Sequence, residues 1–170
     1  MNQPTTPADF NTCDLCDAHE KDDPPGFAAL PPVFRDYGPT PRFAGQVSTV
    51  RCFEDNTKVK EAVESPGNGR VLVVDGGASV RRALVGGILA TAARRNGWAG
   101  IVIDGAVRDA AELRAAGIGV KALALMPHRS TKRDEGARDV PVTVQGVAVR
   151  PGDWLYADED GIVVSPRPLT

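Results

Sequence analysis

Long apolar runs are absent from this sequence, and aromatic side chains are scarce. No stretch of about 18 consecutive apolar residues and no secretory signal peptide occurs, so a cytoplasmic location without membrane association is expected. Phe, Trp and Tyr make up only 5% of the 170 residues, whereas hydrophobic residues make up 42%. The core is therefore expected to consist of small and β-branched side chains.

A strong excess of either charge is also missing. The formal net charge is −2 at pH 7, which argues against a surface dedicated to RNA or DNA, although an acidic protein can still bind a basic segment of another protein. No linker or internal repeat divides the chain, so residues 1–170 are predicted to form one domain. Residues 1–7 are polar and contain proline, and they are predicted to be disordered.

Cysteine is rare as well. The three cysteines, Cys13, Cys16 and Cys52, form an odd set without secretory context, so reduced thiols are expected. The Cys13-x-x-Cys16 spacing suggests a metal or redox site, but a structural zinc site needs a second ligand pair, and only Cys52, His19 and His128 remain to supply it. The alternative is that Cys13 and Cys16, three apart on a helix, face the core as small hydrophobic residues.

The sequence does contain a central block in which buried strands alternate with helices. Apolar runs over 71–74 and 101–103 each end at an Asp-Gly pair and are predicted to be strands of an α/β sheet. Helices are predicted over 87–96 and 107–116, because a glycine follows each of them. Ligands of such sheets gather where strands end and helices begin, since the first N–H groups of a helix are free.

Two corners of this block are therefore predicted to face an anion. They are Gly86-Gly87-Ile88-Leu89 and Gly105-Ala106-Val107-Arg108-Asp109. A guanidinium such as Arg108 can hold a carboxylate through two hydrogen bonds, and a neighbouring carboxylate such as Asp109 can hold Mg²⁺, which needs few protein ligands. Together they would bind a small 2-oxo acid against the bare glycine backbone. The alternative is structural: Asp109 favours the helix dipole, and Arg108 forms an i,i+4 pair with Glu112.

The remaining chain adds strands at both ends. Helices are predicted over 9–19 and 55–64, and strands over 43–52, 120–125, 140–144, 147–150, 154–157 and 161–164. Prolines predict an irregular loop over 21–41. Helices in the middle and strands at the ends favour a single-domain α/β sandwich, in which one β layer packs beside the sheet that carries the helices.

Residues 126–139 are predicted to form a charged, turn-rich loop between two of these strands. Its basic residues Arg129, Lys132, Arg133 and Arg138 are interleaved with acidic ones, a pattern typical of a solvated surface. A phosphate or nucleic-acid site is the alternative, and the sequence leaves both open.

Five segments carry a resemblance to a known family. They are FAGQVSTVRCFEDN (43–56), GRVLVVDGGASVRRALVGGILA (69–90), NGWAGIVIDGAVRDAAEL (96–113), IGVKALA (118–124) and GDWLYADEDGIVVSP (152–166). From about Cys16 to Pro166 the chain resembles the RraA family, which includes the regulators of ribonuclease activity A and related 4-hydroxy-4-methyl-2-oxoglutarate/4-carboxy-4-hydroxy-2-oxoadipate aldolases. The resemblance implies a β/β/α swivelling-type sandwich that assembles as a homotrimer or a dimer of trimers, with sites at subunit interfaces.

For the aldolases, the resemblance also implies roles for individual residues. Arg108 would bind the pyruvyl carboxylate, Asp109 would be the direct protein ligand of Mg²⁺ or Mn²⁺, and the backbone of residues 86–89 would complete the substrate pocket. The metal would act as a Lewis acid during cleavage of 4-hydroxy-4-methyl-2-oxoglutarate to pyruvate, and the same chemistry would support oxaloacetate decarboxylation.

The chain departs from the aldolase pattern at one position. A further Asp of that pattern, which belongs to the outer shell of the metal, is replaced here by Gly87. Asp104 or Asp75 could substitute for it through water, and Gly87→Asp is otherwise expected to raise turnover. The alternative function is a non-enzymatic regulator that binds and inhibits an RNase E-type endoribonuclease. A methyltransferase is not expected, because VVDGGAS lacks a glycine-rich nucleotide-binding turn.

Overall fold

The computed structural model describes residues 9–21 and 23–170, and the predicted disorder of residues 1–7 lies outside them. The helices are α1 (Thr12–His19), α2 (Thr57–Glu64), α3 (Gly87–Arg95) and α4 (Ala110–Ala115). The strands are β1 (Ala28–Ala29), β2 (Arg35–Asp36), β3 (Phe43–Arg51), β4 (Val71–Asp75), β5 (Ala83–Val85), β6 (Gly100–Val107), β7 (Gly119–Leu125), β8 (Ala137–Arg138), β9 (Val142–Val144), β10 (Val147–Val149), β11 (Trp154–Ala157) and β12 (Ile162–Ser165). None of the described helices is long and apolar enough to cross a membrane.

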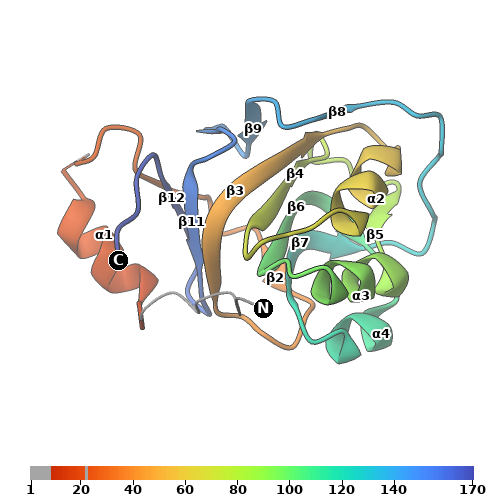
Figure 1. Ribbon diagram of the computed structural model, residues 1–170, viewed down its shortest axis with the longest axis horizontal. Coiled ribbons are helices and arrows are strands. Elements are labelled where there is room, and N and C mark those ends of the chain that lie inside the picture. Colours follow the sequence, from red (N-terminus) through yellow and green to blue (C-terminus); the bar gives the residue numbers. More distant parts are fainter. Residues whose placement is uncertain (1–8, 22) are drawn as a thin grey trace.

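Strand β3 runs through the middle of the molecule and belongs to two layers (Figure 1). Its first half, Phe43 to Gln46, pairs antiparallel with β11, and its second half, Val47 to Arg51, pairs parallel with β4. The order along the sheet is β1-β12-β11-β3-β4-β6-β7-β2, with β5 paired to β6 and β8 paired to β3, and the β9–β10 hairpin forms a separate sheet. The antiparallel and parallel layers are therefore parts of one curled sheet.

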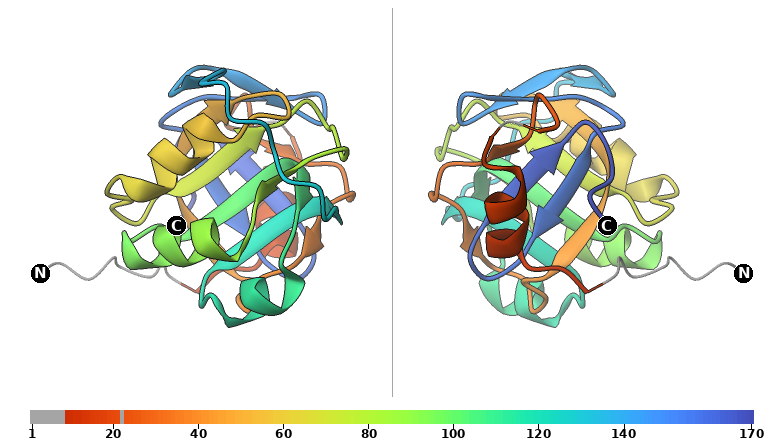
Figure 2. Two further views of the ribbon diagram at one scale, coloured as in Figure 1. Left: turned by 90° about the vertical axis from the view of Figure 1, so that its right-hand side faces the viewer. Right: turned by 90° about the vertical axis from the view of Figure 1, so that its left-hand side faces the viewer.

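The helices cover the outer faces of these layers. Helices α2, α3 and α4 lie over the parallel strands, and α1 lies over β11 and β12 (Figure 2). Along β4, Leu72 and Val74 pack under the helices, whereas Val71 and Val73 pack against the antiparallel layer. Strands that are buried on both faces read as continuous apolar runs, which is why the sequence located them. The predicted α/β sandwich is confirmed.

Two predicted boundaries in the central block are wrong. The strand predicted over 101–103 continues as β6 to Val107, because Ala106 and Val107 pair with β5, a short strand that the sequence analysis missed. The helix predicted over 107–116 consequently begins only at Ala110. The other predicted elements lie at their expected places to within a few residues at each end. The described residues of the two predicted loops carry only the short strands β1, β2 and β8.

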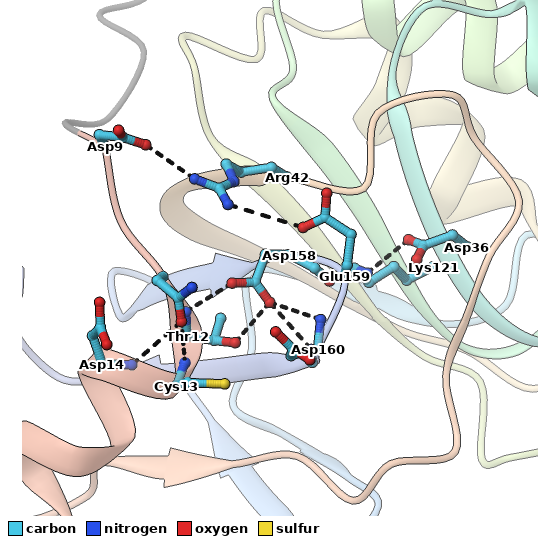
Figure 3. Close-up of polar contacts among 12 residues, drawn as sticks. Asp9, Thr12, Cys13, Asp14, Asp36, Arg42, Lys121, Asp158, Glu159 and Asp160 are labelled. Atoms are coloured by element: carbon cyan, nitrogen blue, oxygen red, sulfur yellow. Dashed lines mark hydrogen bonds and ion pairs between the residues drawn. The ribbon is translucent and has the colours of Figure 1, made fainter.

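Helix α1 is fixed to the antiparallel layer by Asp158, the residue after β11 (Figure 3). The Asp158 carboxylate accepts hydrogen bonds from the N and Oγ1 of Thr12, at 2.7 and 2.6 Å, and from the N–H groups of Asp160 and Gly161 at 3.0 and 3.3 Å. Burial raises the pKa of Asp158, but these hydrogen bonds outweigh burial and hold the pKa below its usual value. The carboxylate therefore stays ionised and caps the start of α1.

The cysteines of α1 belong to no cluster of metal-ligating side chains in the described part of the chain. Among the described residues, no group of three or more His, Cys, Asp or Glu side chains is placed to hold a metal ion. Cys16 packs against the cluster under α1, as the structural alternative predicts, whereas Cys13 is exposed. The charge of Asp160 raises the pKa of the Cys13 thiol and burial raises that of Cys16, which is the opposite of a reactive thiolate.

Candidate active site

Asp109 occupies the turn between the end of β6 and the start of α4. It adopts φ 62° and ψ 52°, a left-handed conformation that Asp tolerates better than most residues. Its main-chain oxygen accepts the N–H of Leu113 at 2.9 Å, and Arg108 donates its own N–H to the oxygen of Val85 at 3.0 Å. The turn, held by β5 and α4, presents two adjacent charged side chains at one strand end.

The two corners predicted from the sequence meet in the structure. Gly86 is the N-cap of α3, and the N–H of Gly87 donates to Oδ2 of Asp109 at 3.1 Å. A Cβ atom on Gly86 would lie 2.5 Å from the same oxygen, so only glycine lets the carboxylate approach this closely. Ile88 is 82% exposed, Leu89 is half-buried, and both line the hollow described below.

A second carboxylate, which the sequence analysis interpreted as a possible partner of Arg108, lies at this corner. Among the ion pairs of the described residues, none joins Glu112 to Arg108. A Cβ atom on Gly87 would lie 2.5 Å from the Cβ of Glu112 and closer still to its Oε2. Glu112 therefore fills the space into which a side chain at position 87 would extend. The sequence offered one clue, the position of Glu112 in the first turn of the helix that follows Asp109.

The two aspartates considered as substitutes for the missing motif residue are engaged elsewhere. Asp104 is buried, and its oxygens accept from the Nε2 and N of Gln145 at 2.7 and 3.4 Å, at the tip of the β9–β10 hairpin. Asp75 accepts from the N–H groups of Gly77 and Thr143 at 2.9 and 3.4 Å. Both carboxylates tie the hairpin to the parallel strands, and neither lines the hollows at the corner that are described below.

A hollow of about 290 Å³ opens beside Arg108 and Asp109. Four basic side chains line it, and Asp109 is its one acidic residue. The basic residues are Lys60, Arg108, Arg129 and Lys132, and the remaining lining comes from Asn56, Ala83, Gly86, Ile88, Leu89 and Ser130. Glu112 and Gly87 line an adjoining hollow of about 430 Å³. An excess of positive charge in a protein of net charge −2 favours an anionic ligand at this place.

The donors at this corner suit a hard divalent cation. Asp109 and Glu112 are both exposed and offer carboxylate oxygens at the start of α4, beside the start of α3. Mg²⁺ commonly uses one or two protein carboxylates and keeps several waters, so it does not need three protein ligands. Neither hollow is lined by Cys or His, the side chains that zinc prefers.

A comparison with known protein families shows to which family the chain belongs. The profile of the RraA-like family, described as Aldolase/RraA, matches residues 12–164. This chain belongs to the RraA-like family. An RraA-like relative from Albidiferax ferrireducens, described as "Putative 4-hydroxy-4-methyl-2-oxoglutarate aldolase", is 60% identical over 164 residues, which are 92% of this chain and 95% of the relative.

Solved structures share the RraA-like fold of this chain. The RNA-processing inhibitor RraA from Thermus thermophilis has a TM-score of 0.89 and 49% identity, covering 95% of this chain and 96% of that one. An S-adenosylmethionine:2-dimethylmenaquinone methyltransferase from Geobacillus kaustophilus HTA426 has a TM-score of 0.87 and 43% identity, covering 94% and 97%. The fold expected from the resemblance is confirmed, and the three names describe three different functions.

Proposed function

We propose that this RraA-like protein is a divalent-metal-dependent aldolase that cleaves 4-hydroxy-4-methyl-2-oxoglutarate into two molecules of pyruvate and also decarboxylates oxaloacetate. The main support is the meeting of Arg108, Asp109 and Gly86 in one positively charged hollow, where the N–H of the neighbouring Gly87 donates to Asp109. The aldolase name of a relative at 60% identity supports the same reaction. The proposal includes the homotrimer or dimer of trimers, in which a neighbouring subunit would cover the exposed side chain of Ile88.

Arg108 is available to bind the 2-oxo acid end of the substrate. Toward the described residues its guanidinium makes one long hydrogen bond, from Nη1 to the main-chain oxygen of Pro127 at 3.4 Å. In the cleavage the 4-hydroxyl loses its proton, the C3–C4 bond breaks, and the electron pair moves toward the 2-oxo group. A guanidinium beside that group stabilises the negative charge that develops there.

Asp109 and Glu112 are the residues that would hold Mg²⁺ or Mn²⁺. When bound, the cation would act as a Lewis acid on the 2-oxo group. The N–H of Gly87 orients the Asp109 carboxylate, an arrangement of the kind that tunes metal affinity. Glu112 would provide from α4 the carboxylate that the aldolase pattern places at position 87.

A coupled assay for pyruvate release tests this proposal with both substrates, with Mg²⁺ or Mn²⁺ and then with EDTA. Asp109→Asn is expected to lower kcat/KM by about 100-fold or more and to remove the metal dependence, because it weakens the direct ligand. Arg108→Ala should raise KM for the oxo acid by about 10- to 100-fold and also lower kcat, because the guanidinium both binds the 2-oxo acid and stabilises the charge that develops during cleavage. Asp17→Asn and Arg114→Ala, exposed residues outside both hollows, are the matched controls. Absence of pyruvate release from either substrate with every metal would reject the aldolase.

A second candidate is the regulator of an RNase E-type endoribonuclease, favoured by the RraA from Thermus thermophilis with its TM-score of 0.89. Inhibition of such an enzyme that persists in EDTA and in Asp109→Asn would establish a role independent of the site. A methyltransferase is less well supported, because the turn after β4 lacks the glycine-rich sequence that a nucleotide-binding turn needs.

A further inference from the structure

The charged loop over 126–139 is held firmly against the hollow. On one side, Ala83 of β5 donates its N–H to the oxygen of His128 at 2.8 Å and accepts a hydrogen bond from the buried hydroxyl of Ser130 at 2.6 Å. On the other side, Thr131 donates its N–H and hydroxyl to the oxygen of Glu54 at 2.9 and 3.0 Å. Because β5 leads directly into the start of α3, the loop and the glycine corner share one support.

A buried carboxylate completes this support. Asp55 is fully buried, and its Oδ1 accepts from the N and Oγ1 of Thr57, at 2.9 and 2.7 Å, while its Oδ2 accepts the N–H of Arg133 at 2.5 Å. Burial raises the pKa of Asp55, and these hydrogen bonds outweigh burial and hold the pKa below its usual value. An ionised carboxylate thus ties the loop to the start of α2.

The charges that alternate along this loop separate in space. Asp134 pairs with Lys58 of α2 at 2.8 Å, and neither residue lines the hollow. Arg129 and Lys132 do line it, and among the described residues no acidic side chain pairs with either. Arg133, next to Lys132, does not line it. Two cations without an acidic partner are therefore presented beside Arg108 on a fixed backbone.

We infer that Arg129 and Lys132 form a subsite for the second carboxylate of the substrate, the one beyond the bond that breaks. This inference rests on the proposed function, in which Arg108 takes the 2-oxo acid end. Both 4-hydroxy-4-methyl-2-oxoglutarate and oxaloacetate carry such a second carboxylate, and a hollow of about 290 Å³ has room for one molecule of either. The loop thereby selects dicarboxylic over monocarboxylic 2-oxo acids, because a site built around a charged group discriminates against an analogue that lacks it.

The subsite has different consequences for the two reactions. In aldol cleavage the second carboxylate keeps its charge in the product, so the two cations bind substrate and transition state about equally and act on KM. In oxaloacetate decarboxylation that carboxylate leaves as CO₂, and its electron pair passes to C3 of the pyruvyl part. Cations that hold the carboxylate then stabilise the ground state more than the transition state, so their removal should raise KM without lowering kcat.

Equilibrium binding tests the subsite without turnover. 2-Oxoglutarate lacks the 4-hydroxyl group and cannot undergo the cleavage, and 2-oxobutyrate is the same molecule without the second carboxylate. With Mg²⁺ present, calorimetry on Arg129→Gln/Lys132→Gln should show about 10- to 100-fold weaker binding of 2-oxoglutarate and little change for 2-oxobutyrate. Arg133→Gln is the control for the loss of one positive charge from the same loop outside the hollow, and the single variants Arg129→Gln and Lys132→Gln are compared with it.

Equal losses of affinity for 2-oxoglutarate and 2-oxobutyrate in the double variant would overturn the subsite. The same selective loss of affinity for 2-oxoglutarate in Arg133→Gln would overturn it too, because the overall positive charge of the loop would then explain the binding. Kinetics supply the second readout: KM for oxaloacetate should rise in the double variant while kcat is unchanged or higher, and a lower kcat at unchanged KM would also overturn it. If the wild-type protein releases no pyruvate yet prefers 2-oxoglutarate through Arg129 and Lys132, the proposed function fails and the subsite stands.

Discussion

Replacing Gly87 with aspartate would restore the aldolase pattern in sequence, yet the structure predicts that it destabilises the protein. A Cβ atom at position 87 would lie 2.5 Å from the Cβ of Glu112, about 1 Å inside an ordinary carbon contact of about 3.5–4 Å. Both atoms are fixed to helix backbones, so α3 and α4 would have to separate. Such overpacking costs about 1–3 kcal/mol, which lowers Tm by about 2–12 °C for a chain of this size.

A double-mutant cycle separates this steric effect from the loss of a carboxylate. Glu112→Gly removes the opposing Cβ; alone it should cost about 1 kcal/mol as a glycine inside a helix and lower pyruvate release about tenfold or more, because the second carboxylate is lost. The variant Gly87→Asp/Glu112→Gly should regain Tm relative to Gly87→Asp and activity relative to Glu112→Gly. Circular dichroism measures Tm and the coupled assay measures pyruvate release, each over a titration with Mg²⁺.

The reasoning would be refuted by a Gly87→Asp protein with an unchanged Tm and faster turnover. That result would show that Glu112 neither blocks position 87 nor fills the role of the missing aspartate. Additive effects in the cycle would contradict it as well, since two side chains that compete for one space must be coupled.

Two further predictions concern the carboxylates that hold the fold together. Asp158→Asn should lower the free energy of unfolding at pH 7 by about 2–3 kcal/mol. Hydrogen bonds lower the pKa of Asp158 in the folded protein. The loss of unfolding free energy relative to wild type, measured by urea titration, should therefore be largest above the unfolded pKa and should shrink as pH falls through the folded pKa. Gln145→Ala removes the side-chain amide donor of the buried Asp104 carboxylate and leaves it only the longer hydrogen bond from the main-chain N–H at the hairpin tip. It should cost about 1–3 kcal/mol in the same assay, with Gln46→Ala as the exposed control. A loss of pyruvate release in Gln145→Ala at unchanged stability would show that the hairpin acts on the site instead.

Elements with a strong local pattern could be predicted from the sequence. β4 is apolar along its whole length because it is buried on both faces, and the Asp-Gly pair after Val74 marks its end. The same reasoning failed at Asp104-Gly105, where β6 continues. There the aspartate is satisfied by Gln145, 41 residues later in the chain, and the strand is extended by pairing with β5. Neither partner is visible in the local sequence.

Some residues of the candidate site could likewise be proposed from the sequence, and others could not. Arg108 and Asp109 could be proposed from the sequence because they are adjacent and follow a buried strand. The role of Glu112 could not, because an i,i+4 spacing from Arg108 equally predicts an ion pair. The sequence also could not show that Arg129 and Lys132 lack an acidic partner. Acidic residues alternate with them along the loop, and spacing alone does not reveal that Asp134 pairs with Lys58 instead. What was missing in each case was the partner across a tertiary contact.

The absence of the motif aspartate therefore argues less strongly against an aldolase than the sequence alone suggests. A sequence motif specifies a place in the chain, whereas the water shell of a metal ion requires a carboxylate at a place in space. The first turns of α3 and α4 adjoin, so a side chain from either helix reaches the same volume, and the contact between Gly87 and Glu112 shows that only one of them can fill it. Glycine at 87 is then the condition for glutamate at 112. On the proposed function the two positions should be substituted and interpreted as a pair.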